Sequence, residues 1–272
     1  TGYSNILINR GNISNKGVEV GLNFDVISND DIQLSIGGNI AFNRTKLESL
    51  GVPQSELFIN GIAQQRSFFF GNQVSRGQIF NSQPNIFVEG EETSLFYGFE
   101  TDGIYQTDDT DLAPGSVPGD VRIVDQNSDG IIDTDDLTFI GNPNPDFIYG
   151  LNLNFRYKRL NVSMLLNGVH GNDIANGNLL TIGNATGQFL NISSDAYYNA
   201  WRPDAQSNTH PRIGYDTRGD IAITDRIIED GSFLRLNNLT IGYDLPVDNL
   251  SLFQRFNVFV TAQNLFTWTN YS

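Results

Sequence analysis

An acidic stretch at 125–136 has the residue types and spacing of a calcium-binding loop. Oxygen-bearing side chains occupy positions 1, 3, 5, 9 and 12 of a twelve-residue loop, and Gly130 stands at position 6. Calcium takes roughly six to eight oxygen ligands, and a glycine at this position permits the sharp turn that gathers them. We therefore predict a structural Ca²⁺ site whose ligands are five side chains and, at position 7, a backbone carbonyl: Asp125, Asn127, Asp129, Ile131, Asp133 and Asp136.

Two features of this loop depart from the usual calcium pattern. Position 12 is Asp136 in place of glutamate, and its shorter side chain is less suited to bidentate ligation. No pair of flanking helices is evident from the sequence. The alternative is a loop of Asx turns whose carboxylates are hydrated and hold no metal.

Other catalytic chemistry finds little support. His170 and His210 lie in no nucleophile or metal motif, and the chain has no cysteine. No serine elbow and no phosphate-binding glycine loop occurs before a helix. The net charge of −15 excludes a nucleic-acid-binding surface of the usual basic kind. We expect a protein that is not an enzyme, and no substrate-binding residue can be assigned.

The acidic loop leads into a segment with period-two alternation, to which Ile148 is the exception. From Phe147 to Tyr157, aromatic and aliphatic residues occupy the odd positions, and mainly glycine, asparagine and arginine occupy the even ones. Strand side chains point alternately to opposite faces, so this strand has one apolar and one polar side. About ten such residues suffice to cross a bilayer at a tilt. The pattern is typical of a transmembrane barrel strand.

Six segments of this kind are predicted along the chain: Ile13–Ile27, Ile32–Leu47, Phe147–Tyr157, Leu160–Val169, Ser232–Leu245 and Phe256–Leu265. The fifth alternates less cleanly, because Leu234 and Leu236 are out of phase with Leu239 and Ile241.

Short connections alternate with two long excursions, 48–146 and 170–231. This asymmetry is typical of outer-membrane barrels, which have tight periplasmic turns and long extracellular loops. Short strands are expected at Ile86–Glu89, Ser94–Glu100 and Ile104–Tyr105, and a helix is expected within Asn178–Trp201. The predicted fold is all-β: residues 1–272 form an incomplete section of a large antiparallel transmembrane β-barrel, because six strands cannot close a transport lumen.

A series of motifs resembles the C-terminal barrel of SusC/RagA-type TonB-linked outer-membrane transporters. They occur in the family's order over nearly the whole chain: Asn15–Glu19, Phe96–Ile104, Gly119–Val121, Asp125–Asp133, Ile140–Phe147, Gly168–Asp173, Trp201–Asp204, Phe233–Tyr243 and Gln263–Phe266.

The resemblance implies a barrel of about twenty-two strands with an N-terminal plug. It implies uptake of oligosaccharides or peptides with a SusD-like surface lipoprotein, energised by the TonB complex, in a Gram-negative outer membrane of the Bacteroidetes type. The plug, the TonB-contacting segment and roughly the first two-thirds of the wall have no counterpart in this sequence.

A secreted calcium-dependent carbohydrate-binding β-sandwich is the alternative. It accounts for the acidic loop and for aromatic residues in the excursions, but it leaves the membrane-length amphipathic strands unexplained.

Overall fold

The computed structural model describes residues 11–72, 74–75, 81–179, 191–214, 223–246 and 256–272. The chain divides into two compact units. We call Asn15–Arg44, Asn144–Asn172 and Asp230–Ser272 the sheet unit, and Thr1–Ser14, Thr45–Pro143 and Asp173–Glu229 the loop unit. Among the described residues, no helix has the length and hydropathy needed to cross a membrane.

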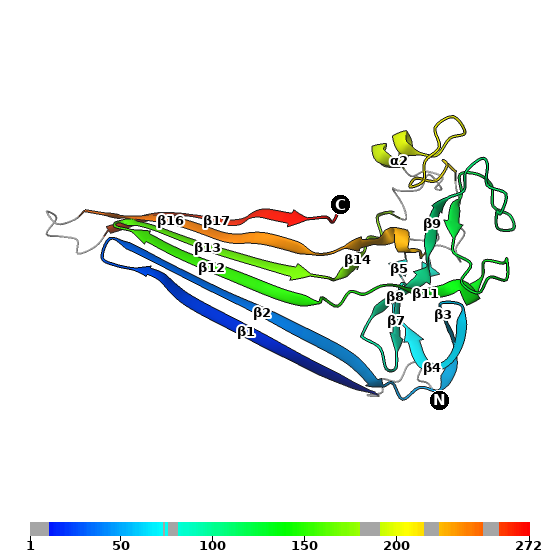
Figure 1. Ribbon diagram of the computed structural model, residues 1–272, viewed down its shortest axis with the longest axis horizontal. Helices are drawn as coiled ribbons and strands as arrows, with labels where there is room; N and C mark the ends of the chain where they lie inside the picture. Colours follow the sequence, from blue (N-terminus) through cyan, green and yellow to red (C-terminus); the bar gives the residue numbers. More distant parts are fainter. Residues whose placement is uncertain (1–10, 73, 76–80, 180–190, 215–222, 247–255) are drawn as a thin grey trace, which may run out of the picture. The chain divides into compact units, whose positions relative to one another are not determined.

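The sheet unit is built on six antiparallel strands that lie side by side in Figure 1 in the order β1-β2-β12-β13-β16-β17. Their bounds are Asn12–Ser28 (β1), Ile32–Ser49 (β2), Phe147–Tyr157 (β12), Leu160–His170 (β13), Phe233–Leu245 (β16) and Phe256–Thr269 (β17). All six predicted segments are therefore strands, the sheet stays open, and the predicted partial barrel is confirmed.

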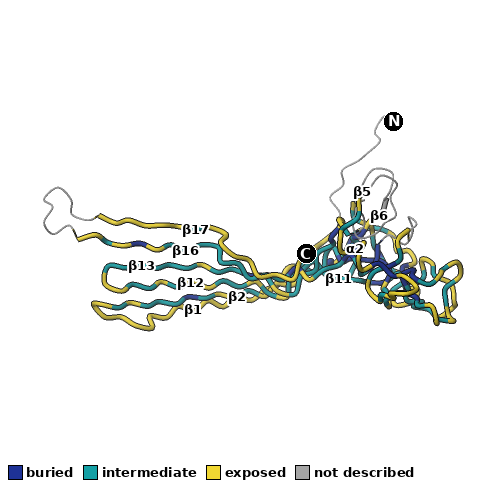
Figure 2. The backbone as a smooth tube through the Cα atoms, turned by 90° about the horizontal axis from the view of Figure 1, so that it is seen from above, coloured by how far each residue is buried: buried dark blue, intermediate teal, exposed yellow. Residues whose placement is uncertain are grey.

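Pairing register places the apolar rows of neighbouring strands on one face. Leu153 of β12 lies opposite Ile36 of β2 and Met164 of β13, and the same parity holds along these strands. The apolar side chains of β1 are largely solvent-exposed, with Leu22 at 56% and Phe24 at 60%. In Figure 2 the strands of this sheet are mostly coloured exposed or intermediate. A broad apolar face thus lacks a protein covering within the described residues, which is unusual for a water-soluble domain.

A β-bulge explains the uneven alternation of β16. Leu165 and Leu166 of β13 pair with Asn238 and Leu236, so β16 has one extra residue, Asn237, between them. The extra residue reverses the parity of the strand. As a result, the aliphatic residues before and after the bulge lie on the same face, although their spacing in the sequence puts them out of phase. They pair with the apolar row of β13: Leu234, Leu236, Leu239 and Ile241.

The loop unit has a five-stranded sheet in the order β11-β8-β7-β4-β3 and three two-stranded pairs. The sheet strands are Gln54–Ile59 (β3), Ile62–Phe70 (β4), Asn85–Val88 (β7), Leu95–Phe99 (β8) and Leu137–Gly141 (β11). The pairs are Val74–Ser75 (β5) with Asn81–Ser82 (β6), Thr101–Ile104 (β9) with Val121–Ile123 (β10), and Asp173–Ala175 (β14) with Ile228–Asp230 (β15). A short α-helix, Ser194–Asn199 (α2), lies within the segment where a helix was predicted, and 3₁₀ turns lie at Thr134–Asp136 (η1) and Asp225–Ile227 (η2).

The two excursions fold together in the loop unit. One core cluster contains Trp201 from the second excursion with residues of the first: Phe99, Ile104, Val121 and Ile123. The Phe99 amide also donates to the Ile223 carbonyl at 2.9 Å. A second cluster lies under the five-stranded sheet around Ile86, Val88 and Tyr97. These excursions are therefore structured parts of one unit, each contributing to a shared core.

Candidate functional site: the polar face and the acidic loop

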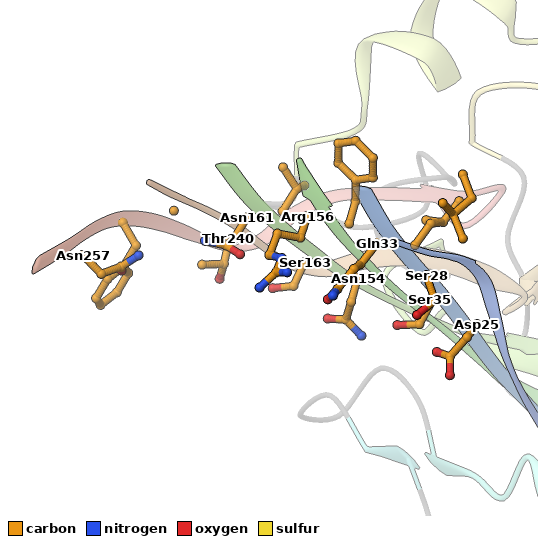
Figure 3. A pocket seen from close by; sticks show the side chains of 16 residues that line it. Asp25, Ser28, Gln33, Ser35, Asn154, Arg156, Asn161, Ser163, Thr240 and Asn257 are labelled. Carbon is orange, nitrogen blue, oxygen red and sulfur yellow. The ribbon is translucent and has the colours of Figure 1, made fainter. Parts of the chain in front are cut away.

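The polar face of the sheet unit carries a cavity that all six strands line. Each strand contributes hydrophilic side chains to it: Asp25, Gln33, Ser35, Asn154, Arg156, Asn161, Ser163, Thr240 and Asn257. In Figure 3 the labelled side chains project from the strands into this space. Because side chains alternate along a strand, these residues lie on the face of the sheet that is opposite to the apolar rows. The sheet therefore has one apolar face and one polar face. The arrangement suits solute binding on the polar side.

Glycines on this face leave room for the side chains of neighbouring asparagines. A Cβ added at Gly37 of β2 would lie 2.6 Å from Asn152 Nδ2. A Cβ added at Gly150 of β12 would lie 2.6 Å from Asn39 Oδ1. A side chain at either position would displace a neighbouring asparagine amide, so these glycines leave room for the asparagines on the polar face.

The acidic loop forms a succession of Asx turns. Asp125 accepts hydrogen bonds from the amides of Ser128 (2.6 Å) and Gly130 (2.7 Å). The Asp129 carboxylate accepts from the Ile131 amide at 2.8 Å, and Gly130 has the positive φ of 82° that the predicted sharp turn requires.

The last predicted ligand, Asp136, is fully buried and closes the loop. Its two oxygens accept from the amides of Gln126 (2.8 Å) and Asp133 (3.0 Å). Asp133 in turn caps η1 by accepting from the Asp135 amide at 2.9 Å. Both carboxylates thus have a structural role in the fold of the loop.

The predicted ligands have the right chemistry for calcium but are not gathered around one point. Within the described residues, no group of three or more Asp, Glu, His or Cys is arranged to hold a metal ion. The carboxylates still crowd one another: the pKa of Asp135 is raised by desolvation and then by the nearby charges of Asp133 and Glu56. The calcium site stays a prediction from the spacing of the loop.

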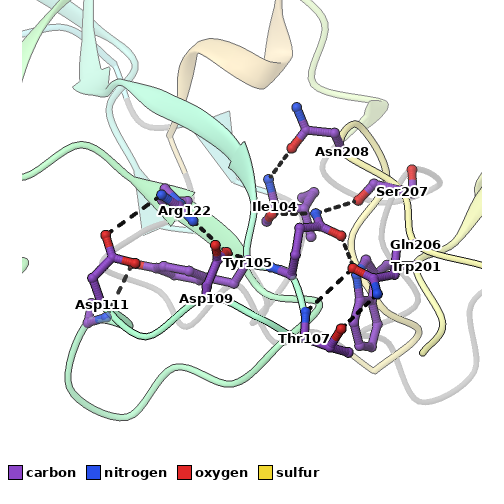
Figure 4. Close-up of polar contacts among 12 residues, drawn as sticks. Ile104, Tyr105, Thr107, Asp109, Asp111, Arg122, Trp201, Gln206, Ser207 and Asn208 are labelled. Carbon is purple, nitrogen blue, oxygen red and sulfur yellow. Dashed lines mark hydrogen bonds and ion pairs between the residues drawn. The ribbon is translucent and has the colours of Figure 1, made fainter.

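A network of polar contacts joins the two excursions around Trp201 (Figure 4). The indole Nε1–H donates to Gln106 Oε1 at 3.0 Å, and Gln106 Nε2 donates to the Ser207 carbonyl at 3.1 Å. The Ile104 amide donates to Asn208 Oδ1 at 3.2 Å. Sequence reasoning missed this network, because its members are about a hundred residues apart.

Arg122, which lies just before the acidic loop, is held between aromatic and acidic partners. Its Cζ lies 4.8 Å from the centroid of the Tyr105 ring, and its guanidinium pairs with Asp109. The pKa of Asp109 is lowered, first by the backbone hydrogen bond from Gln106 and next by the Arg122 side chain. Arg122 therefore connects residues of the 105–122 segment through an ion pair with Asp109 and a contact with the Tyr105 ring.

The two histidines show no catalytic arrangement. His210 Nε2 lies 2.9 Å from Asp195 Oδ2 and its Nδ1 lies 2.9 Å from Thr209 Oγ1, which connects α2 to the 207–210 turn. The ring of His170 packs against Phe147 with centroids 4.9 Å apart. Both contacts are explained by local packing and hydrogen bonding.

An open antiparallel sheet with one exposed apolar face and a polar cavity on the other matches a section of a β-barrel wall. No family model matches the sequence. TonB-dependent receptor P3 of Formosa agariphila is 32% identical over 278 residues, which cover 100% of this chain and 26% of the relative. TonB-dependent receptor SusC of Bacteroides thetaiotaomicron is 26% identical over 269 residues, covering 97% of this chain and 24% of the relative.

Solved structures agree on the fold. The RagAB peptide transporter matches with a TM-score of 0.69 at 23% identity, covering 97% of this chain and 26% of that chain. The RagAB peptide importer in its open-open state matches with a TM-score of 0.70 at 22% identity, covering 96% and 26%. The chain thus spans about a quarter of the length of the proteins it matches.

The predicted resemblance is confirmed: the chain is similar to a section of TonB-dependent receptors, among them SusC. The relatives are named as receptors and transporters, which are not enzymes, in agreement with the expected lack of catalysis.

Proposed function

We propose that this chain forms part of the barrel wall of a TonB-dependent outer-membrane importer of nutrients, either oligosaccharides or peptides. The observation that supports it most directly is the register of the sheet from β2 to β17, which aligns apolar residues of neighbouring strands on one face and leaves a polar cavity on the other. The apolar face would contact lipid hydrocarbon and the polar face would line the aqueous interior.

The proposal includes partners and orientation. RagAB is described as a peptide transporter, and SusC as a TonB-dependent receptor. By analogy, the full-length parent of this chain would work with a SusD-like lipoprotein and draw energy from the TonB complex. The excursions 48–146 and 170–231 would lie outside the cell, because they connect strand ends opposite the short turns.

The exposed apolar face of the sheet does not favour the β-sandwich alternative. A sandwich buries the inner faces of two sheets against each other. Here the apolar side chains of the six-stranded sheet remain exposed over β1 and β17, with Val260 at 72%. That surface would make a soluble module prone to aggregate.

Cell fractionation of the full-length parent protein tests the importer proposal. We expect the protein in the outer-membrane fraction, resistant to extraction by salt or high pH, because its apolar face requires lipid. A lipoprotein anchored in the outer membrane and a soluble periplasmic binding protein serve as fraction markers. Recovery of the parent from the soluble periplasmic fraction would contradict the proposal.

We also propose that the 125–136 loop binds a structural Ca²⁺ through the residues predicted from its spacing. Titration calorimetry with CaCl₂ on the full-length protein should show binding that Asp129→Ala weakens on the order of tenfold, because one charged oxygen ligand is lost. Asp129 is chosen because the buried Asp136 would perturb folding. Asp111→Ala, an exposed acidic residue outside the loop, is the matched control. Equal heats of binding from the wild type and Asp129→Ala would contradict the proposed calcium site.

A further inference from the structure

Arg156 is the one cationic side chain lining the cavity on the polar face of the sheet unit. It lies near the end of β12, opposite Gln33 of β2 and Asn161 of β13. In Figure 3 its side chain lies among those of Asn161, Ser163 and Asn154. The guanidinium is therefore held on a rigid strand and faces the cavity together with neutral polar groups.

The hydrogen-bonding capacity of Arg156 is not satisfied by the described part of the chain. Its Nε is buried and has no hydrogen-bond acceptor. A guanidinium has five N–H donors and no acceptor, and leaving a buried donor unpaired is costly. The Nε atoms of Arg66 and Arg122 are also buried without an acceptor, but those two guanidiniums pair with Glu91 and Asp109. Arg156 forms no such ion pair among the described residues, and most buried side-chain donors have a partner.

The nearby carboxylates do not supply that acceptor. Asp244 accepts from Asn161 Nδ2 and from Asn257 Nδ2, both at 3.1 Å. Asp25, the single carboxylate lining the cavity, is exposed and forms no ion pair with Arg156. The site thus has an excess of donors and a positive charge that no acidic side chain of the described residues neutralises.

Arg235 provides a useful contrast on the same face. Its Nε donates to Thr267 Oγ1 at 3.1 Å, and its Cζ lies 5.0 Å from the centroid of the Phe233 ring. Both the planar surface and the Nε of this guanidinium have partners within the protein. Arg156 and Arg235 therefore carry the same charge but differ in what they can offer to a ligand.

We propose that Arg156 binds an oxyanionic group, a carboxylate, sulfate or phosphate, of a ligand that passes along the polar face. A planar guanidinium matches such groups with two parallel N–H···O bonds. The neutral amide of Asn154 and the hydroxyl of Ser163 are suited to the remaining oxygens. This inference rests on the proposed function in one respect, that the polar face lines an aqueous passage, and it narrows the substrate class to ligands with an anionic group.

Crystals of the full-length parent protein soaked in selenate test the site, because selenium gives an anomalous signal at its own position. We expect a peak within hydrogen-bonding distance of the Arg156 guanidinium. The peak should be lost in Arg156→Gln and retained in Arg235→Gln, the matched removal of a charge on the same face. Arg156→Lys, which keeps the charge without the planar fork, should retain it at reduced occupancy.

Competition distinguishes the possible sources of the oxyanion. Displacement of selenate by acetate assigns the site to carboxylates, and displacement by sulfate or phosphate alone assigns it to tetrahedral anions. Displacement by neutral acetamide, a peak that persists in Arg156→Gln (an adventitious ion only), or no peak in the wild type would each overturn the proposal. A parent protein that resides in the outer membrane but shows no selenate at Arg156 contradicts this inference alone, whereas a soluble parent contradicts the proposed function.

Discussion

Replacing Trp201 with alanine is expected to destabilise the loop unit by about 3–5 kcal/mol, the usual cost of deleting a buried tryptophan side chain. Trp201 is 6% exposed and packs in the core cluster with Phe99 and Ile104. A Cβ added at Gly119 would lie 2.5 Å from its ring, which shows how closely the backbone approaches the indole. The substitution would leave a cavity and would also leave Gln106 Oε1 without its indole donor.

The effect should be cooperative across the two excursions, since Trp201 is contributed by the second and most of its neighbours by the first. Hydrogen exchange of the full-length protein would report it as faster exchange in both 95–124 and 196–212. Tyr198→Ala is the matched control, because Tyr198 is also aromatic but 71% exposed, and it should change stability by no more than about 0.5 kcal/mol. Similar exchange in the two variants would show that the excursions do not depend on a shared core.

A lysine on the apolar face of the sheet should destabilise the membrane-inserted protein by about 2–4 kcal/mol, whereas a lysine on the polar face should be tolerated. Leu153 and Asn154 are adjacent in the middle of β12 and point to opposite faces. Leu153→Lys would place an ammonium group in hydrocarbon, while Asn154→Lys would place it in the polar cavity.

Urea-dependent folding of the full-length protein into lipid vesicles measures this difference. We expect a lower midpoint for Leu153→Lys and a nearly unchanged one for Asn154→Lys, with a small decrease from repulsion by Arg156. Both variants introduce a lysine at neighbouring positions of one strand, so the total charge and the new side chain are the same in both. Equal midpoints would show that the two faces do not meet different solvents.

Local pattern was enough to predict the six long strands, since a strand's alternation depends only on its own residues. The β3–β4 hairpin was missed although it carries a strong local signal. Asn60 and Gly61 have φ values of 51° and 68°, the conformation expected of an Asn-Gly turn between two strands. The Asn60-Gly61 dipeptide is thus a local sequence signal for a hairpin inside the first excursion.

The calcium-like spacing predicted the turn of the acidic loop but not which groups its carboxylates would bond to. Gly130 turns as expected, whereas Asp136 is buried and bonded to backbone amides. The spacing is shared by metal loops and by Asx turns, and sequence alone does not separate them. The difference depends on which amides lie within reach of each oxygen, and this is a property of the folded loop.

The amino-acid sequence alone specifies which side chains of each strand share a face, because backbone geometry makes that pattern local and periodic. It also contains the motifs that indicate the transporter class. Register across strands, the parity reversal at Asn237, the joining of the two excursions through Trp201 and the unpaired guanidinium of Arg156 emerge only from the fold. Each of these depends on residues far apart in the chain, whose contacts are set by the free energy of the whole assembly of strands and leave no periodic trace in the sequence.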